Sequence, residues 1–136
     1  MDDLKSVTRI AVAGMKVQAE RLRVISQNLA NADSVGQRPG ETPYRRKLIT
    51  FEDAMDREMG LRSVHVRGVT EDMSPFPKRL DPSHPAADAD GYVMMPNVDP
   101  LVEMMDMREA QRSYEANMST ISVAREMAKR TLEMLK

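Results

Sequence analysis

The chain has 136 residues, a formal net charge of -1 at pH 7 and 30% charged residues. This size fits one domain, or one small domain with helical arms, and the near-neutral charge gives no reason to expect nucleic acid as a partner. The chain contains no cysteine, which excludes disulfides and thiolate metal sites.

The sequence shows neither a transmembrane segment nor a secretory signal. No run of about 18 apolar residues occurs, the length that a membrane-spanning helix needs. At the N-terminus, Asp2 and Asp3 take the place of a basic region, and Arg9 and Lys16 interrupt any apolar stretch. If the protein leaves the cytoplasm, we therefore expect it to be exported without a cleaved signal peptide.

Residues 1–36 are predicted to form an N-terminal helix. All eight prolines lie between Pro39 and Pro100, so both ends of the chain can be continuous helix. Apolar residues recur at spacings of three, four or seven, at Leu4, Ala11, Met15, Leu22, Ile25, Leu29 and Ala32, and a second stripe holds Val7, Ile10, Gly14, Val17 and Val24. The two stripes make a broad apolar face. The helix should stop between Asn31 and Gly36, where turn residues gather.

Residues 37–97 are predicted to form a small β-rich insert with loops. Residues 44–51 and 61–70 alternate and carry β-branched side chains, and residues 91–95 favour a further short strand. The prolines at 75, 77, 82 and 85 indicate an irregular stretch. The basic cluster at residues 44–47 is interpreted as an exposed strand edge that resists unwanted pairing, rather than as a phosphate site.

Residues 98–136 are predicted to form a C-terminal helix that pairs with residues 1–36. Pro100 suits the first turn, Asp99 is a plausible N-cap and Glu103 favours a helix start. A three-four alternation runs through Met104, Met107, Tyr114, Met118, Ile121, Ala128, Leu132 and Leu135, and we expect the face to be widened by Val102, Met105, Ala116, Val123, Met127 and Met134. The predicted fold class is α+β, with two long helices in a coiled-coil-like pair and the insert between them.

Methionine is abundant, at 13 residues, and eight of these lie between Met94 and Lys136. Flexible thioether side chains suit helix contacts that adapt to different neighbours, and they equally suit a helix core within one chain. Both interpretations stay open at the level of the sequence.

We find no catalytic or metal-binding constellation and expect neither a catalytic site nor a cofactor. His65 and His84 are the only histidines, far apart and without cysteine partners. The acidic turn before Gly91 resembles a calcium loop, but Ala86 and Asn97 stand where its first and last acidic ligands belong.

Three segments carry a family resemblance. Residues 26–33 read Ser-Gln-Asn-Leu-Ala-Asn-Ala-Asp, at the end of the first helix; residues 84–98 read His-Pro-Ala-Ala-Asp-Ala-Asp-Gly-Tyr-Val-Met-Met-Pro-Asn-Val, before the last helix; and the last helix contains Glu-Met-Met-Asp-Met at 103–107 and Ala-Gln-Arg-Ser-Tyr-Glu-Ala-Asn at 110–117. Together they resemble the bacterial flagellar axial family of rod and hook proteins. The second segment and the short chain favour a proximal-rod member, in which residues 37–43 look like a short insertion.

The resemblance implies a non-enzymatic structural subunit of the flagellar basal-body rod. Such a subunit would pass through the flagellar type III export apparatus and join a torque-transmitting rod that spans the periplasm. Its partners would be its own copies, other proximal and distal rod proteins and a ring-to-rod adaptor protein. The alternative is a soluble coiled-coil adaptor or export chaperone that binds axial proteins without joining the polymer.

We expect subunits to pack through the apolar stripes and the polar residues within them. The candidate packing residues are Leu22, Ile25, Asn28, Leu29, Asn31, Met107, Gln111, Tyr114, Asn117, Met118 and Ile121. Polar residues in an apolar seam fix register and partner, as asparagine does in coiled coils. Polar contacts within a single chain are the open alternative for the same residues.

Overall fold

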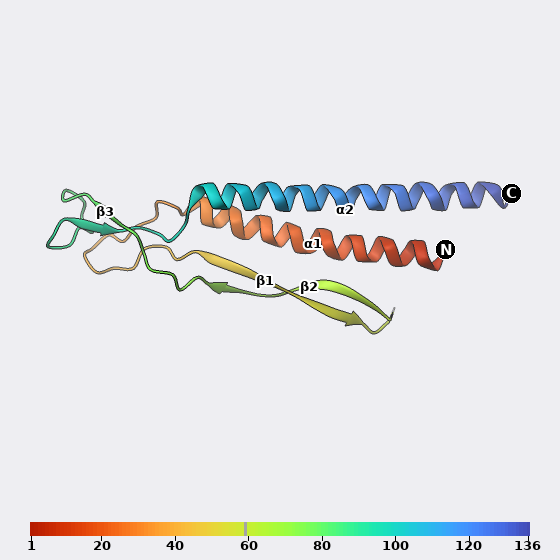
Figure 1. Cartoon of the computed structure of the whole chain (residues 1–136), viewed down its shortest axis with the longest axis horizontal. Helices are drawn as coiled ribbons and strands as arrows, with labels where there is room; N and C mark the ends of the chain where they lie inside the picture. The colour runs from red at the N-terminus through yellow and green to blue at the C-terminus, as the bar shows by residue number, and fades with distance from the viewer. Residues whose placement is uncertain (59) are drawn as a thin grey trace. The chain divides into compact units, whose positions relative to one another are not determined.

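A computed structural model describes residues 1–58 and 60–136 and shows two long helices with a β insert between them (Figure 1). The elements in chain order are α1 (Asp2–Ala30), β1 (Lys47–Asp56), β2 (Leu61–Glu71), β3 (Lys78–Leu80), β4 (Tyr92–Met94) and α2 (Pro100–Met134). The predicted α+β class is confirmed.

Helix α1 ends where its sequence changes from apolar periodicity to turn residues. The side-chain Nδ2 of Asn31 donates a hydrogen bond to the Gln27 carbonyl oxygen at 2.9 Å, and the Ser34 hydroxyl donates to Oδ1 of Asn31 at 3.0 Å. The Gln27 carbonyl also accepts from the Asn31 backbone N–H at 3.1 Å, so the Asn31 side chain reinforces the last turn of the helix. The helix ends at Ala30, directly before the range from Asn31 to Gly36 in which the stop was predicted.

Helix α2 begins as its sequence predicts. Pro100 is its first residue, where a missing amide hydrogen is harmless. Oδ1 of Asp99 accepts a hydrogen bond from the backbone N–H of Leu101 at 3.0 Å, and the Asp99 carbonyl accepts from that of Glu103 at 3.0 Å. Asp99 is therefore the N-cap.

Two small sheets make up the insert. Strands β1 and β2 form one sheet, in which the Asp72 N–H donates to the Arg46 carbonyl at 2.8 Å and the Thr50 hydroxyl donates to the Gly68 carbonyl at 3.2 Å. As the residue number rises from 46 to 50 in the first strand, the number of the partner falls from 72 to 68, so the two strands are antiparallel and form a hairpin.

Strands β3 and β4 form the second sheet, which is also antiparallel. Leu80 pairs with Tyr92, Arg79 with Val93 and Lys78 with Met94. Strand β3 was not predicted, because its three residues lie between prolines and have no pattern of their own. Its pairing with β4 stabilises it instead.

Contacts divide the chain into two units. The first comprises Met1–Leu22, Ile49–Gly68 and Met107–Lys136, and the second comprises Arg23–Leu48 and Val69–Asp106. Small side chains dominate the buried positions: Ala11, Val17, Ala110 and Ala124 in the first unit, and Val24, Ile25, Ala86 and Val93 in the second. Many larger apolar residues stay on the surface instead. Among the described residues, neither helix has an apolar stretch that could cross a membrane.

Candidate functional site

In the first unit, α1 and α2 lie side by side along a seam of small residues (Figure 1). Ala11 of α1 and Ala110 and Ala124 of α2 are buried there. Gly14 lies against the side chain of Asn117, so closely that a Cβ on Gly14 would meet Nδ2 at 2.9 Å. Small residues let the two backbones approach each other closely.

The seam on α2 has the period of a coiled coil. Eight buried or half-buried residues of this unit alternate at spacings of three and four: Met107, Ala110, Tyr114, Asn117, Ile121, Ala124, Ala128 and Thr131. Ser113, next to Tyr114, is also half-buried. This repeat averages 3.5 residues, so one face of α2 stays on its partner along the helix.

The residues expected to widen this face are exposed in the single chain: Val102, Met105, Val123, Met127 and Met134 are exposed by 45% to 79%. Met127 follows Ala124 by three residues and precedes Thr131 by four, so it lies beside the seam, whereas Val123 points away from it. We call these exposed apolar residues the outer stripe.

The structure brings most of the candidate packing residues to the helix pair. Ile25 and Asn28 are buried, Leu22, Leu29, Asn31, Met107, Tyr114, Asn117 and Ile121 are half-buried, and Gln111 and Met118 are exposed. The asparagines make contacts within the chain, since Nδ2 of Asn117 donates to the Ser113 carbonyl at 3.0 Å. Packing of these residues between subunits stays a prediction.

A buried polar network in the second unit joins the end of α1, the start of α2 and the insert. Asn28 is 1% exposed and Glu103 is fully buried. Nδ2 of Asn28 donates to Oε2 of Glu103 at 3.3 Å and to the Lys47 carbonyl at 2.9 Å, while Oδ1 of Asn28 accepts from the Lys47 N–H at 2.9 Å. A buried polar group needs such partners, because leaving it unpaired costs about 1–3 kcal/mol.

Arg46 supplies the positive charge that the buried Glu103 carboxylate requires. Its Nε donates to Oε1 of Glu103, its Nη1 lies 3.4 Å from Oδ2 of Asp72 and its Nη2 lies 3.7 Å from Oδ2 of Asp106. Burial by itself would lower the pKa of Arg46. The hydrogen bonds and negative charges of Glu103 and Asp72 outweigh this effect and raise the pKa of Arg46. The Arg46 guanidinium is therefore held in its charged form beside Glu103.

Tyr44 and Asp72 complete the network. The Tyr44 hydroxyl donates to Oδ1 of Asn28 at 2.8 Å, and burial together with the Glu103 charge raises the pKa of Tyr44. Hydrogen bonds from the Ser74 hydroxyl and backbone N–H, with a further contribution from Arg46, lower the pKa of Asp72. The network thus consists of charged and polar groups with paired partners.

This network was not predicted from the sequence. Residues 44–47 were expected to form an exposed strand edge, but all four are half-buried, and Arg45 stacks over the Phe76 ring at 4.2 Å from the centroid. Glu103 was expected to favour the start of the helix. The partners of Arg46 lie 26 and 57 residues away along the chain, and no local pattern signals contacts of that kind.

Comparison with known proteins identifies the family. The protein-family model described as flagellar basal body rod FlgEFG protein C-terminal matches residues 89–134 of this chain. The flagellar basal-body rod protein FlgC of Agrobacterium fabrum is 46% identical over 136 residues, covering 100% of this chain and 98% of that protein. This chain belongs to the FlgC family.

Two more distant FlgC proteins match with similar coverage. The Salmonella typhimurium protein is 38% identical over 131 residues, covering 96% of this chain and 97% of its own length, and the Bacillus subtilis protein is 37% identical over 140 residues, covering 92% and 93%. As a member of the FlgC family, the chain is a structural subunit of the flagellar basal-body rod. No group of three potential metal ligands occurs among the residues that the structure describes.

Proposed function

We propose that this rod subunit belongs to the proximal rod and assembles by packing apolar surfaces of its terminal helices against neighbouring subunits. The observation that carries the proposal is the outer stripe on α2. Its large apolar residues are exposed in the single chain, and a contiguous exposed apolar surface marks an interaction site.

The outer stripe is suited to a neighbour rather than to the fold of one chain. In the first unit it comprises Val123, Met127 and Met134, which are 56%, 53% and 79% exposed. Burying apolar surface stabilises an assembly by about 25 cal/mol per Å², and the same gain recurs at each subunit of a polymer. Methionine side chains also adapt to neighbours of different shape.

The buried network suits a mechanical role. Asn28, Arg46 and Glu103 hold the two helices and the insert together through paired hydrogen bonds within the second unit. A satisfied buried network favours one arrangement over its alternatives, since any other arrangement leaves polar groups unpaired. A subunit that transmits torque needs such a fixed junction, and we assign it no catalytic step.

The proposed partners follow from family membership. They are further copies of the chain, other proximal and distal rod proteins, the ring-to-rod adaptor and the flagellar type III export apparatus, with the rod spanning the periplasm. The relatives all carry the rod-protein name, which supports a polymer subunit over a soluble adaptor or an export chaperone.

The test is complementation of a strain that lacks the chain. We expect a tagged copy to restore motility and to appear in the proximal part of the rod in maps of purified basal bodies. Recovery of the tagged chain only as a soluble complex with another axial protein, with none in basal bodies, would contradict the proposal.

A further inference from the structure

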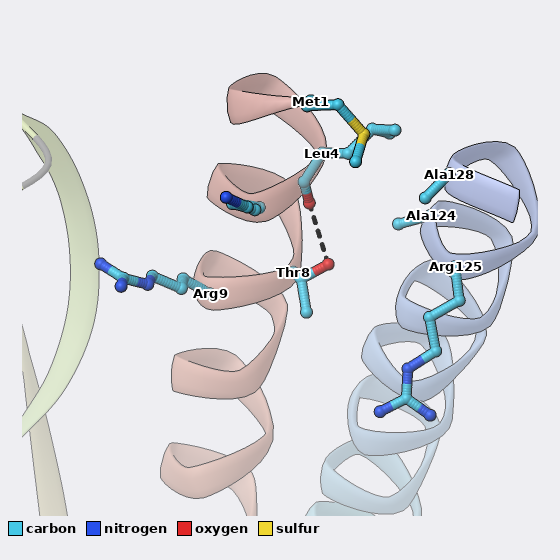
Figure 2. A pocket seen from close by; sticks show the side chains of 8 residues that line it. Met1, Leu4, Thr8, Arg9, Ala124, Arg125 and Ala128 are labelled. Atoms are coloured by element: carbon cyan, nitrogen blue, oxygen red, sulfur yellow. Dashed lines mark hydrogen bonds between the residues drawn. The ribbon is translucent and has the colours of Figure 1, made fainter. Parts of the chain in front are cut away.

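The open ends of the two helices form an apolar pocket within the first unit. It has a volume of about 340 Å³. Met1 and two residues of α1, Leu4 and Thr8, line one side, and Ala124 and Ala128 of α2 line the other (Figure 2). The two alanines are too short to fill the space between the helices, so the pocket can accept an apolar side chain from elsewhere.

The charged residues that line this pocket are all cations. They are Lys5, Arg9 and Arg125. Within the described part of the chain, none of the three takes part in a salt bridge. The Thr8 hydroxyl donates to the Leu4 carbonyl at 2.9 Å (Figure 2), so its polar group is already satisfied. The matching occupant is therefore an apolar group flanked by carboxylates.

Residues 51–56 of β1 have this character. Their sequence, Phe-Glu-Asp-Ala-Met-Asp, carries three carboxylates and no cation. Phe51 is 39% exposed and Met55 is 58% exposed. Alternate residues of a strand share a face, so Asp53 lies between these two apolar side chains, while Glu52 and Asp56 lie on the other face. Oδ2 of Asp53 lies 3.2 Å from Nε of Arg62, but both side chains are exposed, and an exposed pair of this kind is weak enough to exchange partners.

The hairpin of the same chain is already engaged elsewhere on α1. A separate pocket is lined by Val12 and Val17 of α1 together with Val64 and Val66 of β2. The hairpin thus directs β2 valines toward its own helix while Phe51 and Met55 stay exposed. The occupant of the pocket at the helix ends must then come from another molecule.

We propose that residues 51–56 of a second copy dock in the pocket between Met1, Leu4, Ala124 and Ala128. Phe51 and Met55 enter the apolar space, and the Asp53 carboxylate between them faces Lys5 and Arg125. The docking segment and the pocket are different parts of the chain, so each copy can insert residues 51–56 into one neighbour and accept the same segment of another neighbour in its own pocket. Such heterologous contacts can extend into an open polymer. This inference rests on the proposed function and names one contact by which rod subunits join.

The absence of cysteine from the chain allows a direct test by cross-linking. Met55→Cys and Ala128→Cys are placed on separate copies and co-expressed in a strain without the native chain. A disulfide needs Cα atoms within about 7 Å. We expect mild oxidation of purified basal bodies to give a dimer between the two variants, with a yield roughly tenfold above that of the control pair.

The control pair combines Met55→Cys with Ser119→Cys, because Ser119 is exposed on the opposite side of α2 from Ala128 and lies outside the outer stripe. Adding Arg125→Glu to the Ala128→Cys copy should lower the yield roughly fivefold, since it reverses one charge of the pocket. Phe51→Cys provides a second hairpin position. Equal cross-linking in the test and control pairs, in cells that remain motile, would overturn this inference and leave the rod function intact. Absence of the unmodified chain from purified basal bodies would instead overturn the proposed function itself.

Discussion

Gly14 and Asn117 meet across the helix pair so closely that a Cβ on Gly14 would lie 2.9 Å from Nδ2 and 3.1 Å from Cγ of Asn117. The Asn117 side chain is held in place by its hydrogen bond to the Ser113 carbonyl. The amide thus occupies the space that the missing side chain leaves, and the contact fixes which turn of α1 faces which turn of α2.

The first prediction is that Gly14→Ala changes the stability of the fold in opposite directions in the native chain and in an Asn117→Ala background. In the native chain, Gly14→Ala should destabilise the fold, because the clash costs about 1–3 kcal/mol and exceeds the roughly 1 kcal/mol that alanine gains in a helix. In an Asn117→Ala background the same substitution should stabilise the fold by about 1 kcal/mol. Denaturant unfolding of the four variants measures this coupling, and equal effects in both backgrounds would show that the contact does not set the register.

The second prediction concerns the buried charge pair. Glu103→Gln should destabilise the chain by about 2–4 kcal/mol, because it leaves the Arg46 guanidinium without its buried carboxylate. Glu126→Gln is the matched control, since its pair with Arg130 is exposed on α2 and should change stability by less than about 0.5 kcal/mol. Thermal unfolding compares the two, and similar effects of both would rule out the network as a stabilising junction.

The third prediction is a dependence on pH. The folded chain lowers the pKa of Asp72, so the ionised carboxylate contributes stability above its ordinary pKa, and this contribution is lost as the pH falls through the lowered value. Ser74→Ala removes the strongest of the lowering hydrogen bonds. NMR titration should show the pKa of Asp72 moving up toward its ordinary value in this variant, and the loss of stability in acid should become smaller. An unchanged titration would contradict this assignment.

The fourth prediction tests the helix seam in the cell. Leu29→Asp and Ile121→Asp each place a charge at a half-buried position, where desolvation costs several kcal/mol. We expect each to abolish rod assembly and motility while the chain is still made. Ser119→Asp, at an exposed position of the same α2 helix, should leave swimming near normal. Motility assays with purified basal bodies decide the matter, and intact rods built from both aspartate variants would refute the seam.

Local sequence was sufficient to predict both helices and every strand except β3. Helix ends depend on residues within one turn, so Asp99, Pro100 and the asparagine-rich turn after Ala30 could be located from the chain alone. The three-four spacing of apolar residues likewise revealed the helices. The quoted motifs at residues 26–33, 84–98 and 103–117 were enough to suggest the flagellar axial family.

Tertiary structure alone decided which surfaces are inside. Periodicity identified many apolar positions on α2, but only the position of α1 shows which of them are buried: Ala110 and Ala124 are buried, whereas Met105 and Met127 are exposed. The network of Asn28, Arg46, Asp72 and Glu103 was equally invisible, because hydrogen bonds between residues tens of positions apart leave no local spacing. Burial and charge pairing are properties of which segments meet in space, and a pattern along one segment cannot contain the identity of its partner.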